Sequence, residues 1–214
     1  MRGAGGPLER PRSELVSPPV DLDEVVLGRE DLYEGGFLRL HRDRVRLPGG
    51  GEGERLVVDH PGAVAILPVT DDGRIVLVWQ YRQAAGKALL EIPAGKLTPG
   101  EAPDACARRE LREETGYEAG RLHRLGRFLP SPGFSGEWLS LYVAESLVAG
   151  AAQPDADEFL ATVHATPAEL GRLLAQGAIE DLKTAAAFLW WRLGAPPLGA
   201  EAAAPRGMDP PGPA

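Results

Sequence analysis

Two neighbouring apolar runs constrain the fold of this 214-residue chain more than any other feature. Residues 62–69 (GAVAILPV) and 74–81 (RIVLVWQY) are rich in β-branched side chains and show almost no alternation of polar and apolar positions. A strand with one face in water alternates, whereas a continuous apolar run is typical of a strand that is covered on both faces. Asp71-Asp72-Gly73, between the runs, has the composition of a hairpin turn. The two runs therefore predict a sheet that carries a packed layer on each side.

The rest of the central region predicts the helices that form these layers. Residues 102–115 predict a helix, because Pro103 suits its first turn and Gly116 its C-terminal cap. Residues 167–176 and 179–192 predict two closing helices. Further strands are expected at residues 37–47, 54–59, 122–129 and 138–144. Strands before and after a central helix, followed by two helices, predict an α/β fold in which helices sandwich a mixed sheet.

Glycine and proline, which number 27 and 20, gather at the two ends of the chain. Residues 1–20 and 195–214 contain little that could be buried, so both predict disordered tails. Between the tails, the short polar strands of residues 21–60 predict a small N-terminal antiparallel β-lobe, and residues 61–194 predict the main domain.

Composition and charge exclude several classes of protein. The 23 Lys and Arg residues against 31 Asp and Glu give a net charge of −8, so a nucleic-acid-binding surface is not expected. Four His and one Cys leave no Cys/His zinc cluster and no intramolecular disulfide. No run reaches the roughly 18 to 20 apolar residues that cross a bilayer, and no secretion signal is apparent. The sequence therefore predicts a cytoplasmic protein that binds neither nucleic acid nor membrane.

Residues 95–117 (GKLTPGEAPDACARRELREETGY) place acidic side chains on one side of the predicted helix. Glu110 and Glu114 stand one turn apart with Glu113 beside them, and an apolar stripe lies next to this acidic face. Like charges one turn apart cost about 0.2–0.5 kcal/mol even when exposed, and partial burial raises that cost. The spacing therefore calls for positive charge among the glutamates.

Two kinds of positive charge are available to the acidic face. Arg109 lies one turn before Glu113 and can neutralise one carboxylate. A divalent cation can neutralise the rest, and Mg²⁺ held by carboxylates together with substrate phosphates fits this pattern. Gly95 and Gly100 bracket the loop before the helix and permit close approach of a ligand. The segment predicts a magnesium–diphosphate site, and the alternative is a solvated acidic helix face with salt bridges.

The same segment resembles the Nudix signature, G-x5-E-x7-R-E-U-x-E-E-x-G-U, in which U is apolar. The signature is matched at Gly95, Glu101, Arg109, Glu110, Leu111, Glu113, Glu114 and Gly116, with Tyr117 at the last position. The resemblance extends over about residues 30–190. Residues 79–82 (WQYR), 90–95 (LEIPAG) and 131–135 (SPGFS) resemble the ADP-ribose pyrophosphatase branch, whereas Gly136 stands where relatives often carry an acidic residue.

The resemblance implies a fold and an assembly. Residues 61–194 would form a Nudix-type α/β/α sandwich with a mixed β-sheet. The N-terminal β-lobe, residues 21–60, would be exchanged with a second subunit in a homodimer and would help to build each active site. An isolated hairpin is marginal alone, so docking on a partner is physically reasonable, and the alternative is an ordinary polar strand face.

The resemblance also implies roles for the signature residues. Glu110 and Glu114 would be metal ligands, with the carbonyl of Ala94 completing the coordination sphere. Glu113 would be a ligand or a base, and Arg109 would orient the glutamates.

Outside the signature, the resemblance implies a base and a substrate-binding set. Glu137 resembles the general base that takes a proton from the attacking water, with a surface carboxylate as the alternative. Arg82 would contact the diphosphate, or else end a strand with a solvated head, and Glu91 would contact the substrate or a metal. Pro132 and Gly133 share the loop of Glu137 and would contact the substrate, unless the proline only stiffens a turn.

The implied function is hydrolysis of ADP-ribose to AMP and ribose 5-phosphate, with Mg²⁺ or alternatively Mn²⁺ as cofactor. The nearest alternative substrate is another nucleoside diphosphate derivative, such as a sugar nucleotide or an oxidised nucleotide. A different class is a non-catalytic ADP-ribose sensor. Such sensors usually lose the catalytic carboxylates, whereas this chain keeps Glu110, Glu113 and Glu114.

Overall fold

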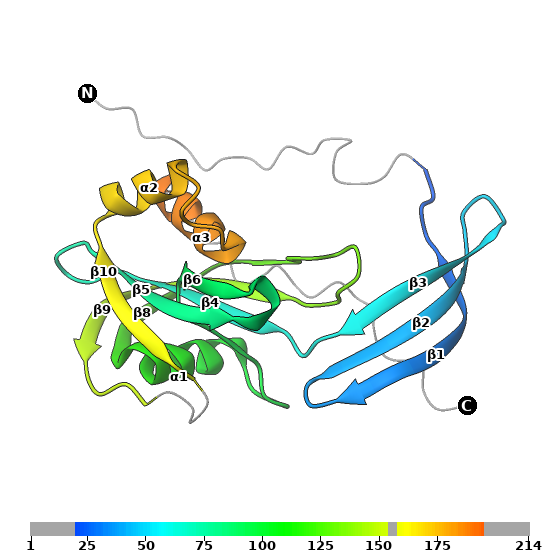
Figure 1. Cartoon of the computed structure of the whole chain (residues 1–214), viewed down its shortest axis with the longest axis horizontal. Helices are drawn as coiled ribbons and strands as arrows, with labels where there is room; N and C mark the ends of the chain where they lie inside the picture. The colour runs from blue at the N-terminus through cyan, green and yellow to red at the C-terminus, as the bar shows by residue number, and fades with distance from the viewer. Residues whose placement is uncertain (1–19, 154–157, 195–214) are drawn as a thin grey trace. The chain divides into compact units, whose positions relative to one another are not determined.

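The computed structural model describes residues 20–153 and 158–194 (Figure 1). Apart from Val20, the two predicted tails lie outside the described residues. The chain divides into two compact units between Val58 and Asp59, close to the predicted start of the main domain at residue 61. Each unit has its own sheet system and is described separately.

The first unit is a three-stranded sheet in the order β1-β2-β3. Its strands are β1 (Val25–Gly35), β2 (Leu38–Arg46) and β3 (Glu52–Asp59). β1 and β2 form an antiparallel hairpin, which confirms the predicted N-terminal antiparallel lobe. The sequence does not predict β1, because its polar and apolar residues do not alternate and nearly all of them are exposed.

The second unit contains a four-stranded sheet, β7-β4-β9-β8, and a three-stranded sheet, β10-β5-β6. Its strands are β4 (Ala63–Pro68), β5 (Ile75–Arg82), β6 (Lys87–Glu91), β7 (Ala94–Lys96), β8 (Tyr117–Phe128), β9 (Leu139–Ala149) and β10 (Leu160–Ala165), with a 3-10 turn at Gln83–Ala85. β4 pairs with β9 in parallel, whereas β7 and β8 pair antiparallel with their neighbours. The sheet is therefore mixed, as predicted.

The two apolar runs that open the domain lie in different sheets. The predicted turn between them forms, since the Thr70 N–H donates to the Arg74 carbonyl at 2.9 Å. The expected hairpin is nevertheless limited to a single bridge between Val69 and Ile75, after which the strands diverge. All six residues of β4 are buried, because a layer covers each face of this strand.

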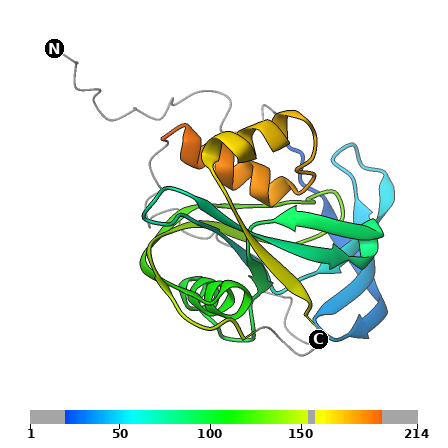
Figure 2. The same ribbon diagram turned by 60° about the vertical axis from the view of Figure 1, so that its left-hand side comes forward.

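Three helices form these covering layers, and Figures 1 and 2 show one helix below the sheets and two above them. They are α1 (Pro103–Thr115), α2 (Pro167–Ala175) and α3 (Leu182–Arg192). α1 packs Ala107 and Leu111 against Ile66 on one face of β4, whereas Leu170 and Phe188 of the other two helices join the cluster on the opposite face. The predicted α/β/α sandwich is therefore confirmed.

The sequence does not predict β6, β7 and β10, which are three to six residues long. Segments this short lack enough residues to show a period, and long-range pairing defines them. The last helix begins at Leu182 rather than at the predicted residue 179, because Asp181 caps it by accepting the Thr184 N–H at 3.0 Å.

None of the helices in the described part of the chain is long and apolar enough to cross a membrane.

Candidate functional site

Helix α1 presents the signature glutamates at the border of the core. Leu111 and its apolar neighbours face the sheet, and this orientation buries Glu110 and Glu114, which are 8% and 3% exposed. Glu113 is half-buried. The expectation that the acidic face borders the buried side of the helix is therefore correct.

Strand β7 runs directly against these glutamates. A Cβ atom on Gly95 would lie 1.9 Å from the carboxyl carbon of Glu110, so any larger residue here would displace that carboxylate. The backbone N–H of Ala94 donates to Glu114 Oε2 at 3.2 Å. The structure thus brings Ala94, Gly95 and the two buried glutamates together, as the sequence predicts.

Arg109 connects the carboxylates on one side of the site. Its Nη1 donates to Glu110 Oε1 at 2.7 Å and to Glu113 Oε2 at 2.9 Å, and its Nε donates to Glu101 Oε1 at 2.9 Å. The sequence predicts that Arg109 neutralises one carboxylate, and the structure gives it three. The guanidinium holds the pKa of Glu101 near 2, well below its ordinary value, with hydrogen bonds from Thr98 contributing.

Glu114 has the most perturbed carboxyl group of the acidic face. Burial, together with the nearby charges of Glu110 and Glu158, raises its pKa to about 8, although the Ala94 N–H and Arg82 oppose the shift. Burial also raises the pKa of Glu110, although Arg109 opposes that shift. In the absence of further positive charge, the pair therefore tends to keep a proton.

A second cluster of charges surrounds Glu91 at the end of β6. Glu91 is 1% exposed and accepts hydrogen bonds from Arg82 Nε at 3.0 Å and Arg82 Nη2 at 2.7 Å. Lys183 of α3 pairs with the same carboxylate. Burial disfavours the charge on Glu91, but Arg82 and Lys183 outweigh burial and lower its pKa. Arg82 and Glu91, both predicted to contact a ligand, thus contact each other here.

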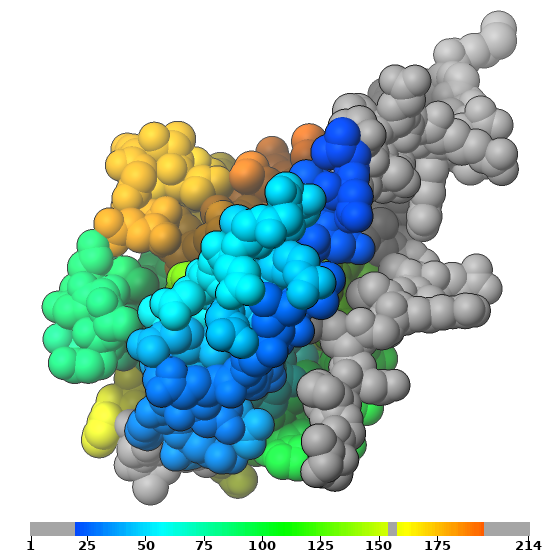
Figure 3. Space-filling model, turned by 90° about the vertical axis from the view of Figure 1, so that its right-hand side faces the viewer, coloured from blue at the N-terminus to red at the C-terminus, as the bar shows by residue number. Residues whose placement is uncertain are grey.

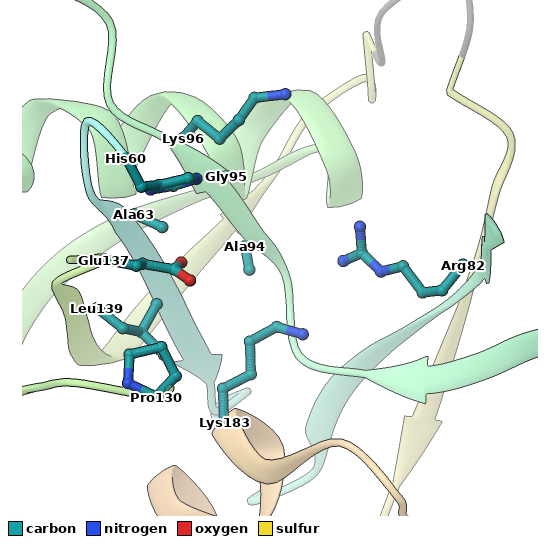
Figure 4. A pocket seen from close by; sticks show the side chains of 10 residues that line it. All are labelled: His60, Ala63, Arg82, Ala94, Gly95, Lys96, Pro130, Glu137, Leu139 and Lys183. Atoms are coloured by element: carbon teal, nitrogen blue, oxygen red, sulfur yellow. The ribbon is translucent and has the colours of Figure 1, made fainter. Parts of the chain in front are cut away.

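A pocket of about 250 Å³ opens between these two clusters (Figure 4). It is lined by His60, Ala63, Arg82, Ala94, Gly95, Lys96, Pro130, Glu137, Leu139 and Lys183. Figure 4 shows Ala94 between Glu137 on one side and Arg82 on the other. Pro132 and Gly133 are exposed and do not line the pocket, although Pro130 of the same loop does. Their predicted substrate contacts, like those of Arg82 and Glu91, stay predictions.

Comparisons with known proteins decide the family. The NUDIX domain model matches residues 59–188, and the model of the nucleoside diphosphate sugar hydrolase N-terminal domain matches residues 24–58.

The chain belongs to the Nudix family.

Several named proteins are similar to this Nudix chain. An ADP-ribose pyrophosphatase of Bacillus subtilis (strain 168) is 39% identical over 174 residues, which cover 80% of this chain and 94% of the relative. The methanol dehydrogenase activator of Bacillus methanolicus is 41% identical with the same coverage. An ADP-ribose pyrophosphatase of Mycobacterium tuberculosis is 45% identical over 126 residues, 58% of this chain and 61% of the relative.

A solved structure shares the fold of this Nudix chain. It is described as an ADP compounds hydrolase, has a TM-score of 0.72 and 22% sequence identity, and covers 82% of this chain and 96% of its own. At this identity the likeness supports the fold alone.

Nudix ADP-ribose pyrophosphatases in general depend on divalent metals, and the donor set here fits such an ion. Glu110 and Glu114 are buried oxygen donors. Arg109 pairs with Glu110 and Glu113, and Arg82 acts on Glu114 through its charge. Within residues 20–153 and 158–194, no three acidic, His or Cys side chains yet stand close enough together to hold a metal. Arg109 holds Glu110 and Glu113 in this arrangement.

Four titratable residues of the site are not predicted from the sequence. His60, Lys96 and Lys183 line the pocket, and Glu158 is close enough to Glu110 and Glu114 to raise the pKa of both. Burial lowers the pKa of His60, while the charge of Glu137 opposes that shift. His60, Lys183 and Glu158 belong to no spaced motif, because contacts between distant parts of the chain bring them to the site, whereas Lys96 directly follows Gly95 at a variable position of the signature.

Metal-free protein should lose stability as the pH rises from 5.5 to 7.5. The folded state keeps a proton on Glu114 up to about pH 8, whereas the unfolded chain releases it near the ordinary value of 4.5. The folded state therefore binds more protons in this window, and stability falls by up to about 1.4 kcal/mol per pH unit. Urea unfolding in the presence of a chelator measures this slope.

The variant Glu114→Gln isolates the contribution of Glu114 to the pH dependence of stability, because the other groups titrate alike in the wild type and the variant. Its slope should be flatter than that of the wild type, whereas the exposed-site control Glu118→Gln should keep the wild-type slope. Equal slopes in the wild type and Glu114→Gln would contradict the raised pKa.

Proposed function

We propose that this Nudix hydrolase cleaves the diphosphate of ADP-ribose to AMP and ribose 5-phosphate. One observation carries the proposal: a complete signature whose glutamates are buried beside Gly95, in a chain that spans 94% of a Bacillus subtilis ADP-ribose pyrophosphatase. The match of residues 59–188 to the NUDIX domain supports the hydrolase assignment.

The proposed metal is Mg²⁺, with Mn²⁺ as the alternative. Glu110, Glu113, Glu114 and the carbonyl of Ala94 would hold it, and these are the hard oxygen donors that both ions prefer. When bound, such an ion offsets the charge that develops on the phosphoryl oxygens. Arg109 would orient the glutamates while it keeps its hydrogen bonds to Glu101.

The proposed chemistry is an in-line attack of water on one phosphorus of the diphosphate. Glu137 lies in the pocket with Ala94 and would take the proton of the attacking water. The new P–O bond forms as the bond to the second phosphate breaks, and that phosphate leaves with the electron pair. Glu158 is a second candidate for this role, because its charge acts on Glu110 and Glu114.

The remaining side chains would bind and shape the substrate. Arg82 would bind the diphosphate from the wall opposite Glu137, with Glu91 holding its guanidinium in place. Pro132 and Gly133 would border the mouth of the pocket, since the same loop supplies Pro130 to the lining.

A second candidate substrate is a sugar nucleotide. The match of residues 24–58 to the nucleoside diphosphate sugar hydrolase N-terminal domain favours it, whereas the named relatives favour ADP-ribose. An oxidised nucleotide and the non-catalytic sensor remain alternatives without such support, and the three signature glutamates argue against a sensor.

We further propose a homodimer in which a second copy covers apolar side chains exposed in both units. Figure 3 presents β1 to β3 to the viewer, and Val25, Val26, Leu32 and Leu56 of this unit are exposed. In the second unit Trp79, Tyr81 and Phe159 are exposed. A second copy that covered these side chains would remove apolar surface from water.

The cytoplasmic location stays a prediction.

A substrate panel tests the proposed reaction. With Mg²⁺, the purified protein should convert ADP-ribose to AMP and ribose 5-phosphate faster than it hydrolyses UDP-glucose, GDP-mannose or an oxidised nucleoside triphosphate. Glu114→Gln should lower the rate roughly a thousandfold or more, because it removes a charge that holds the metal. Chromatography of the products measures both, with Glu118→Gln as control. Near-full activity of Glu114→Gln would refute the site.

Glu137→Gln and Glu158→Gln distinguish the two candidate bases. If Glu137 takes the proton, Glu137→Gln should lower kcat by roughly 100- to 10,000-fold with little effect on Mn²⁺ affinity. Glu158→Gln should mainly weaken Mn²⁺ binding, because Glu158 faces Glu110 and Glu114. Steady-state kinetics at saturating metal and Mn²⁺ titration measure the two effects. The reverse pattern would assign the base to Glu158.

Analytical ultracentrifugation tests the homodimer. The wild type should sediment as a dimer, and the double variant Leu32→Glu/Leu56→Glu as a monomer, because it places charge on the apolar side chains that the second copy would cover. Leu193→Glu, at an exposed position after α3, should leave the dimer intact. A monomeric wild type at micromolar concentration would contradict the assembly.

A further inference from the structure

The start of α3 is tied to the bend between β6 and β7, although the two segments lie 92 residues apart in the chain. Thr184 is fully buried, and its Oγ1 accepts the backbone N–H of Ile92 at 2.8 Å. Asp181, the N-cap of the helix, in turn accepts hydrogen bonds from the Thr184 backbone and hydroxyl. The hydroxyl of Thr184 therefore satisfies a buried backbone donor of the bend.

Lys183 makes a second tie between the same two segments. Its ammonium group pairs with Glu91, and it also donates to Asp181 Oδ1 at 2.9 Å. Arg82 occupies both oxygens of Glu91 from the other side. Two cations and two carboxylates thus form a neutral group, and the buried Glu91 is the member that joins β6 to α3.

Each of the four residues 91–94 is held by a different partner. The Glu91 side chain is bound by Arg82 and Lys183, and the Ile92 N–H by Thr184. The Pro93 carbonyl accepts the Ile66 N–H at 2.9 Å. The Ala94 N–H reaches Glu114, a signature glutamate. The contacts of α3 therefore lie at one end of a four-residue bend whose other end touches the proposed metal ligands.

The bend leads directly to the proposed metal ligands. A methyl group on Gly95 would meet the carboxylate of Glu110, so β7 passes within contact distance of that side chain. A shift of the bend by a fraction of an ångström would move the Ala94 carbonyl relative to Glu110 and Glu114. Groups that fix the orientation of metal ligands commonly change metal affinity by about 10- to 100-fold.

We propose that Asp181, Lys183 and Thr184 are positioning residues, which hold the bend at residues 91–94 so that Ala94 meets Glu110 and Glu114 in the geometry that a metal needs. The inference rests on the proposed function. It adds α3, a helix outside the signature, to the elements that set metal affinity.

Mn²⁺ binding to the metal-free enzyme, measured by calorimetry without substrate, tests the inference. Thr184→Val removes the acceptor and keeps the side-chain shape, so its Kd for Mn²⁺ should rise about tenfold or more. Lys183→Met should act in the same direction. Thr184→Ser and Lys183→Arg, which restore the hydroxyl and the charge, should return the Kd to within about threefold of the wild type.

Two controls separate positioning from general loss of stability. Thr166→Val makes the same substitution at the N-cap of α2, where the hydroxyl accepts the Glu169 N–H of its own helix, and should leave the Kd unchanged. Phe188→Leu disturbs the core contact of α3 without touching the network, so it should lower the melting temperature but not Mn²⁺ affinity. If Thr184→Val does not fold, Lys183→Met and its rescue by arginine decide the test.

Three outcomes would overturn the inference. An unchanged Kd in Thr184→Val or Lys183→Met, with normal hydrolysis by the wild type, would remove the positioning role and leave the proposed function intact. A rise only in the KM for ADP-ribose in Lys183→Met would make Lys183 a substrate-binding residue instead. A wild type that neither binds Mn²⁺ nor hydrolyses ADP-ribose would refute both the inference and the proposed function.

Discussion

The structure of the site depends on the burial of Glu110 and Glu114 on adjacent turns of α1. The apolar face of the helix buries them when it packs on the sheet, and the removal of carboxylates from water costs several kcal/mol each unless charge or hydrogen bonds compensate. Arg109 compensates Glu110, whereas Glu114 accepts a hydrogen bond from the backbone N–H of Ala94. The high pKa of Glu114 expresses this imbalance. A cation that replaced its proton would remove the same cost, so proton release and metal binding are linked here.

The buried carboxylate of Glu91 has the opposite pKa shift from that of Glu114. It is as deeply buried as Glu114, yet Arg82 and Lys183 hold its pKa below the ordinary value. Glu91 therefore stays ionised and bound, whereas Glu114 keeps a proton that the proposed metal would replace. The two glutamates lie at opposite ends of the bend at residues 91–94 and are connected through it.

The parts of the site that the sequence predicts are those that local spacing determines. The positions of Glu110, Glu113 and Glu114 on one helix, and the need for glycine at position 95, follow from helical periodicity and from the signature. The divergence of β4 and β5 does not follow, because both are apolar runs and periodicity carries no information on which strands pair. Lys183 and Glu158 are not predicted for the same reason, since long-range packing alone brings them near residues 91 and 114.

Arg109 illustrates why a signature can contain a residue that need not touch the metal. The proposed metal would draw Glu110 and Glu113 away from the guanidinium, and a half-buried cation that loses its partners is destabilising. Glu101 prevents that cost, because it binds Arg109 through two hydrogen bonds of 2.9 and 3.0 Å and is itself fixed by the Thr98 N–H. Arg109 can thus release two carboxylates and remain paired. In the proposed metal site, the pairing of Glu101 with Arg109 would thus preserve charge balance when the other two carboxylates bind the metal.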